Sequence, residues 1–269
     1  MSTSANGIDP AEAPAGDLGG TAATVERALD VLICFVRSDA PDLGVTELAE
    51  KLSLSKAAVH RLLTSLRGRG MVEIDEVTHR YRLGPTVLTL SQSYLSRLDV
   101  TALAAPELPW LCRATNETVT LSRRAGLTRY YVEQVLPDRD VVRMVSVGVP
   151  FPLHIGASSK AFLAHLTAAD AETVLAGPLD GPSGRPPLDP DALRAELDQV
   201  RTRGWSHSQS ERDLGTASVA APILDYRGEP RAVMSVCGPA DRFRPEACAA
   251  ALLEVTTRLS RKMGHGVIA

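Results

Sequence analysis

Short polar side chains and a regular apolar spacing meet in the stretch from residue 47 to residue 66. It reads ELAEKLSLSKAAVHRLLTSL, two helix-like runs with one short break between them. The apolar spacing of the second run predicts a helix with one buried face. That face is formed by Leu54, Val59, Leu62, Leu63 and Leu66. The opposite face carries Ser55, Lys56, Ala57, His60, Arg61 and Thr64.

The polar face suits contact with DNA. Arginine pairs with guanine edges, hydroxyls bond bases or phosphates, and the Ala57 methyl can touch that of thymine. In a helix-turn-helix, the first helix crosses the phosphates and the second enters the major groove. The turn then falls at Ser53, where a left-handed conformation is expected that glycine adopts more easily. The stretch therefore predicts a recognition helix.

Two short strand-like pieces follow the recognition helix. They are Met71–Ile74 and Arg80–Leu83, and a polar turn separates them. Such a hairpin is a wing, and it is expected to place His79 and Arg80 near its tip as further DNA contacts.

Local charge supports this interpretation. Between residues 51 and 82 there are seven basic and three acidic residues, a net charge of +4, whereas the whole chain carries −3. A concentration of positive charge is typical of a DNA-contacting face. The alternative is an ordinary helical hairpin whose charges are simply solvated.

The remaining pattern predicts an α+β protein of two domains. The 269 residues are 44% apolar, enough for two cores. In the first domain, helices are expected over residues 24–37, 47–52 (capped by Thr46), 55–69 and 85–97. In the second, helices are expected over 101–115, in the stretch ending at 203 and over 245–263, and residues 156–166 are expected to be a loop running into a helix. Strands are expected near 118–123, 129–135, 141–145, 206–209, 218–223 and 232–238, and this mixture favours an α+β domain.

Composition excludes several other classes of protein. The four cysteines form no CxxC pair, which argues against a zinc site or a disulfide framework and suits a reducing, cytoplasmic location. Residues 1–20 lack the apolar core of a signal peptide and are expected to be a disordered tail. No run of 18 apolar residues exists, so no membrane partner is predicted. No cofactor or metal is expected.

An enzyme is also disfavoured. An S-x-x-K nucleophile motif ending at Lys160 would need serine at position 157, which is Ala157. There is no GxSxG elbow, and the glycine- and proline-rich stretch 177–190 lacks the Gly-Lys-Ser/Thr of a phosphate loop. The competing function is therefore a ligand-binding module whose DNA domain no longer binds specifically.

With these motifs in order, the chain resembles the IclR family of bacterial transcription regulators. The marks are VERALDVL (25–32), VTELAEKLSLSKAAVHRLLTSLRGRGMV (45–72), YRLG (81–84), NETVTLS (116–122), PLHIGASSKAFLAHL (152–166), RGWSHSQSERDLGTASVAAPILD (203–225) and AVMSVCGP (232–239). The resemblance implies a winged helix-turn-helix domain over 21–84, a linker helix over 85–100 and a GAF-like effector-binding domain over 101–264. It also implies a repressor or activator that binds palindromic operators as a homodimer or homotetramer.

The resemblance further implies an effector pocket in the second domain. By position, its residues are Phe151, Leu153, Ala157, Ser158, Ser208, Ser218, Ser235 and Cys237, with the first two as an apolar wall. Backbone N–H groups at the start of the helix near Ser158 favour a carboxylate, and the hydroxyls can orient a small polar ligand. A small carboxylic acid is therefore the preferred class of effector.

This chain departs from the family pattern in the pocket. Ser208 replaces an acidic residue of members that sense small oxo-acids, and no glycine stands within SSK (158–160), so no specific ligand is carried over. The alternatives are structural. Ser158 would cap its helix, Ser218 and Ser235 would bond backbone groups, Lys160 would be a surface or structural residue, and Glu211 would pair with Arg212 or Arg123.

Overall fold

The computed structural model describes residues 18–181 and 186–267. Contacts divide the chain into two compact units that meet in the sequence between Ser96 and Arg97, and each is described by itself. Most of the predicted disordered tail, residues 1–17, lies outside the described residues. Residues 18–20 are helical, so the first helix begins earlier than expected.

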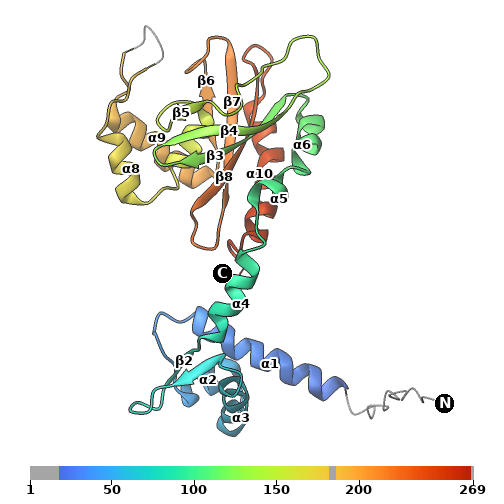
Figure 1. The fold of residues 1–269 in the computed structure, drawn as a ribbon, viewed down its shortest axis with the longest axis vertical. Helices are drawn as coiled ribbons and strands as arrows, with labels where there is room; N and C mark the ends of the chain where they lie inside the picture. The colour runs from blue at the N-terminus through green and yellow to red at the C-terminus, as the bar shows by residue number, and fades with distance from the viewer. Residues whose placement is uncertain (1–17, 182–185, 268–269) are drawn as a thin grey trace, which may run out of the picture. The chain divides into compact units, whose positions relative to one another are not determined.

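The first unit is a helical domain with a small hairpin (Figure 1). Its elements are α1 (Leu18–Val36), α2 (Val45–Leu52), α3 (Lys56–Arg67), β1 (Val72–Ile74), β2 (Tyr81–Leu83) and α4 (Thr86–Leu95). Val31, Leu48, Val59 and Leu63 are fully buried in one apolar cluster, which holds the three first helices together. The two strands pair antiparallel, with Glu73 opposite Arg82.

The start of α2 and the turn after it follow from local chemistry. Helix α2 begins at Val45 with Gly44 as N-cap, so the prediction that Thr46 caps it was wrong. Glu47 causes the earlier start, because its Oε2 accepts the Gly44 N–H at 2.8 Å and satisfies a free donor of the helix end. Ser53 has φ 54° and ψ 41°, which confirms the left-handed turn expected there.

The second unit is an α+β domain built on one antiparallel sheet. Its helices are α5 (Val100–Ala104), α6 (Glu107–Thr115), α7 (Ala157–Leu163), α8 (Ala168–Leu175), α9 (Pro190–Arg203) and α10 (Pro245–Lys262). Its strands are β3 (Thr118–Ala125), β4 (Thr128–Val135), β5 (Pro150–Pro152), β6 (Ser206–Gln209), β7 (Thr216–Leu224) and β8 (Pro230–Pro239). They lie in the order β5-β4-β3-β8-β7-β6.

The two faces of this sheet have different chemistry. Because side chains alternate along a strand, Val119, Val219 and Val236 all point to one face, where they pack with α5, α6 and α10. Helix α7 packs on the opposite face, and α8 and α9 lie on the same side of the sheet (Figure 1). This face carries small polar side chains. On β3, β7 and β8 these are Thr118, Thr120, Ser122, Ser218, Ser235 and Cys237. This second face supplies the floor of the pocket described below.

Two sequence predictions fail in this unit, and helix α8 and strand β5 were missed. Pro106 interrupts the helix expected over 101–115 and divides it into α5 and α6. The strand expected over 141–145 does not form, because the Gln134 side chain bonds both the N–H and the C=O of Val145, each at 3.1 Å. Helix α8 was missed, although Thr167 caps it by accepting the Asp170 N–H.

No helix within the described ranges is long and apolar enough to cross a membrane.

Candidate nucleic-acid interface and ligand pocket

Helix α3 divides into a buried and an exposed face, as the sequence predicts. Val59, Leu62 and Leu63 are buried in the core of the first unit. The six residues predicted to face DNA are all exposed: Ser55, Lys56, Ala57, His60, Arg61 and Thr64. Two of the hydroxyls also serve the helix, since Ser55 Oγ accepts the Ala58 N–H at 3.2 Å and Thr64 Oγ1 donates to His60 O at 2.8 Å.

The wing is a tight hairpin closed by Asp75. Its carboxylate oxygen Oδ1 accepts the N–H groups of Val77 and Thr78, each at 2.9 Å, and these bonds lower the pKa of Asp75. His79 lies in the turn with φ 53°, and its N–H donates to Asp75 O at 2.8 Å. The position of His79 in the loop agrees with the sequence prediction.

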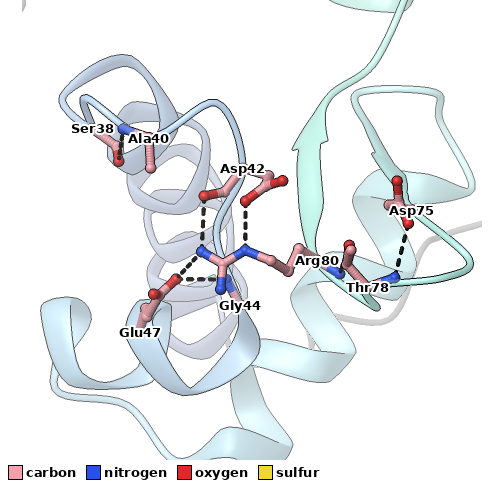
Figure 2. Close-up of polar contacts among 8 residues, drawn as sticks. All are labelled: Ser38, Ala40, Asp42, Gly44, Glu47, Asp75, Thr78 and Arg80. Carbon is pink, nitrogen blue, oxygen red and sulfur yellow. Dashed lines mark hydrogen bonds and ion pairs between the residues drawn. The ribbon is translucent and has the colours of Figure 1, made fainter.

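Arg80 points back into the domain (Figure 2). Its Nε donates to Asp42 Oδ1 at 2.5 Å, and its Nη2 donates to Asp42 O at 3.2 Å and to Glu47 Oε2 at 2.8 Å. Bonds to Asp42 and then Glu47 raise the pKa of Arg80. Next to this cluster, Leu43 and Tyr81 exchange backbone hydrogen bonds of 2.8 and 2.9 Å. Arg80 therefore joins the wing to the connection between α1 and α2.

Arg80→Ala is expected to loosen this junction more than Arg82→Ala does. Arg80 has two carboxylate partners and a side chain 34% exposed, whereas Arg82 pairs with Glu73 alone and is 57% exposed. Amide hydrogen exchange measures the difference, and the Leu43 and Tyr81 amides should exchange faster in Arg80→Ala alone. Equal exchange in the two variants would show that the junction does not depend on Arg80.

The second unit holds a partly open cavity of about 40 Å³ over the polar face of the sheet. Its lining includes six of the eight predicted effector residues: Ala157, Ser158, Ser208, Ser218, Ser235 and Cys237. Strand pairing brings them together, since Ser208 lies opposite Ser218 and Ser218 opposite Cys237. The prediction from family position therefore identified one wall of the cavity.

The hydroxyl and thiol groups of this wall are neutral. Ser235 Oγ lies 2.6 Å from Thr120 Oγ1, a bond between two side chains rather than to the backbone. Burial raises the pKa of the Cys237 thiol to about 12, so it stays protonated at neutral pH. Ser158 does not cap α7, because Gly156 occupies the N-cap position.

The two residues of the predicted apolar wall do not line this cavity. Leu153 is 1% exposed and packs in the cluster of Phe162 and Leu197, while Phe151 lies beside the cavity-lining Tyr131 with ring centroids 5.6 Å apart. Neither is part of the lining, whose apolar members include Tyr131 and Val145. Proximity in sequence to the GASSKA loop does not fix the direction of a side chain, which is why the two residues lie outside the lining.

Five charged residues of the lining were missed as pocket residues. They are Arg129, Arg143, Glu211, Arg212 and Asp213. Asp213 pairs with Arg143 and, at 3.0 Å, with Arg212. The sequence held a usable signal for Arg129. Because side chains alternate along β4, Arg129 and Tyr131 lie on the same face of this strand, and both line the cavity.

Lys160 lies in a buried ion cluster behind the cavity. It is 2% exposed, and its Nζ donates to Glu196 Oε1 at 2.5 Å and to Glu211 Oε1 at 2.6 Å. Glu211 Oε2 also accepts the Gly156 N–H at 3.0 Å. Lys160 is thus structural and not on the surface, and Glu211 pairs with it instead of with Arg212 or Arg123.

Within the described part of the chain, no three His, Cys, Asp or Glu side chains are grouped so that they could hold a metal ion. A winged helical unit with an exposed recognition helix, and a second unit with a small charged cavity, define a DNA-binding protein with a ligand-binding domain.

The comparisons with known proteins agree with this class. Residues 24–76 match the IclR helix-turn-helix domain, and residues 92–264 match the bacterial transcriptional regulator IclR C-terminal domain.

Relatives match over nearly the full length. The HTH-type transcriptional regulator BhcR of Paracoccus denitrificans is 33% identical over 254 residues, covering 94% of this chain and 90% of the relative. The crystal structure of Pseudomonas aeruginosa HmgR has a TM-score of 0.71 and 28% identity, covering 91% of this chain and 99% of HmgR. An IclR homologue from Microbacterium hydrocarbonoxydans, solved with 4-hydroxybenzoate, has a TM-score of 0.55 at 21% identity, covering 90% of this chain and 98% of that one, and shows the fold alone.

The chain belongs to the IclR family of bacterial transcription regulators. It is a DNA-binding regulator with a C-terminal effector domain, and its family and relatives are regulators rather than enzymes.

Proposed function

We propose that the protein reads a palindromic operator through α3 and that a small organic acid in the second unit alters this binding. The observation that carries the DNA proposal is the division of α3, whose exposed face holds the six predicted contact residues opposite the buried Val59, Leu62 and Leu63. His79 in the wing adds a seventh contact. Arg80 acts through Asp42 and Glu47 rather than on DNA. Because the target is chromosomal, we place the protein in the cytoplasm.

The proposal includes self-association to a dimer or tetramer. One recognition helix reads too few base pairs for genomic specificity, and two-fold symmetry doubles the site with half-sites roughly 34 Å apart or a multiple of this. Exposed apolar side chains on α1 and α4 offer surface for a second copy. They include Val25 and Leu29 on α1 and Leu88 and Leu90 on α4, each more than half exposed.

A carboxylic acid is the effector class that the cavity favours. Its lining carries three guanidinium groups and two carboxylates, a net charge of +1, and several neutral hydroxyls. A small acid would balance this charge and bond the hydroxyls. An organic acid, 4-hydroxybenzoate, occurs with one homologue of the same fold.

Selection of bound DNA from a random duplex library, at near-physiological salt, tests the DNA proposal. Enrichment of a palindrome supports it and gives the half-site spacing. If no sequence is enriched, with or without added carboxylic acids, the protein is a ligand-binding module whose DNA domain lacks specificity.

Arg61→Ala should weaken binding to the selected operator and relax sequence choice at one position by ~1–3 kcal/mol, because a bidentate arginine contact discriminates by that amount. Fluorescence anisotropy with operator and single-base variants measures both effects. Arg227→Ala is the matched control, since it removes the same charge from the second unit. Unchanged affinity and unchanged base preference in Arg61→Ala would exclude Arg61 as a base contact.

A further inference from the structure

Arg129 is a fully buried charge that has no carboxylate partner among the residues that the structure describes. It is 1% exposed on β4, at the wall of the cavity. Its Nε donates to Ser159 Oγ at 2.7 Å, and its Nη2 donates to Tyr131 Oη at 3.3 Å. Its Nη1 has no hydrogen-bond partner among the described residues. Both partners are neutral, so the guanidinium charge is not balanced by a direct contact.

Such a group is costly to bury. An ionised side chain removed from water is destabilising unless it is paired, and arginine does not escape this by losing its proton. Burial, and repulsion from Arg212, lower the pKa of Arg129 from its usual value. The rings of Tyr131 and Phe151, with centroids 4.5 and 5.0 Å from the guanidinium carbon, stabilise the cation in part. They do not supply an acceptor for Nη1.

The nearby acids are already engaged. Asp213 pairs with Arg143 and Arg212, and Glu211 pairs with Lys160. The Nε of Arg143, which lines the same cavity, is a second buried guanidinium N–H without a partner within the described ranges. Two of the arginines that line this cavity therefore each keep one buried N–H without a partner in the described part of the chain, and the charges of the lining residues sum to +1.

The size of the cavity fits the missing group. A cavity needs roughly 10–15 Å³ of this volume to hold one water molecule, so about 40 Å³ leaves room for a small polar group at the wall of the cavity. A carboxylate group has three heavy atoms, carries one negative charge and accepts hydrogen bonds at both oxygens.

We propose that Arg129 is the anion receptor of the effector pocket and selects a ligand with one carboxylate group, with Arg143 Nε as the second donor. This rests on the proposed effector function and adds to it the residue that reads the charge. The rest of the ligand then contacts the neutral wall of Ser208, Ser218 and Cys237, and a neutral ligand of the same shape is rejected because it leaves the buried charge uncompensated.

The experiment uses the full-length protein and two pairs of matched probes, formate with formamide and acetate with acetamide. Thermal unfolding and calorimetry are followed at constant ionic strength for the wild type, Arg129→Met and Arg129→Lys. The wild type should be stabilised saturably by the acids and bind them roughly ten-fold or more tighter than the amides. Arg129→Met should bind the acids ten- to hundred-fold more weakly than the wild type, and Arg129→Lys should be intermediate.

Three results would overturn the inference: no saturable binding of formate or acetate to the wild type, equal binding of acids and amides, or wild-type acid affinity in Arg129→Met. The comparison of acid with amide needs no variant, so it remains decisive if Arg129→Met does not fold.

Operator affinity measured at saturating acetate separates the two proposals. If acetate binds through Arg129 and operator affinity is unchanged, the anion receptor stands and regulation by acids fails. If amides bind equally and do change operator affinity, the effector function stands and the receptor role of Arg129 fails.

Discussion

Lys160→Ala is expected to lower the free energy of unfolding of the second unit by about 3 kcal/mol, because removing one partner of a buried ion pair leaves uncompensated charge. The Lys160 side chain is 2% exposed and bonds both Glu196 and Glu211. The expected effect lies at the low end of the usual range of about 3–5 kcal/mol. The side chains of Glu196 and Glu211 are 35% and 27% exposed, so water can reach both carboxylates when Lys160 is removed.

Tryptophan fluorescence during urea unfolding measures this effect. Both tryptophans, Trp110 and Trp205, lie in the second unit, so their signal reports on that unit. Lys51→Ala, on the exposed surface of the first unit, is the matched control. Its free energy of unfolding should stay within about 0.5 kcal/mol of the wild-type value. Lys160→Met combined with Glu211→Gln should recover part of the loss. A transition of Lys160→Ala indistinguishable from the control would contradict the structural role of the cluster.

The sequence predicted the first unit well because its signals are local. The apolar spacing of α3 alone determines that Val59 and Leu63 are buried and that Lys56 and Arg61 are exposed. The Ser53 turn follows from the position between two helices. The ion pairs of Arg80 were not predicted, because its partners Asp42 and Glu47 lie more than 30 residues away in the chain.

The pocket was predicted only in part, because some of its residues are placed by contacts between segments that lie far apart in the sequence. The serines and Cys237 lie on strands whose alternation and family position are readable from sequence. The charged residues depend on tertiary pairing, as Lys160 and Glu211 show across 51 residues of chain. The absent strand at 141–145 is another such case, since the Gln134 side chain, 11 residues from Val145, bonds the backbone groups of Val145 that a neighbouring strand would have used.

Leu63→Ala is expected to lower the stability of the DNA-binding unit by about 2–5 kcal/mol, the range for removing a buried leucine and leaving a cavity. Leu63 is 0% exposed and packs in the same cluster as Leu48 and Val31, so it fixes α3 against α1 and α2. A unit of this length has a total stability of roughly 4–12 kcal/mol, so this loss is a large fraction of it. Operator binding should weaken with it, because DNA binds only the folded unit.

Amide hydrogen exchange along α3 measures this loss directly, since the first unit contains no tryptophan. A loss of 2 kcal/mol corresponds to exchange roughly 30-fold faster at amides that open with the whole unit. Leu214→Ala makes the same chemical change at a side chain 83% exposed in the second unit, and α3 should keep its protection in that variant. If Leu63→Ala weakened operator binding while α3 kept wild-type protection, Leu63 would act on DNA reading by some route other than the stability of the core. Loss of both together would instead show that the buried face of α3 is what presents Arg61 and its neighbours to the operator.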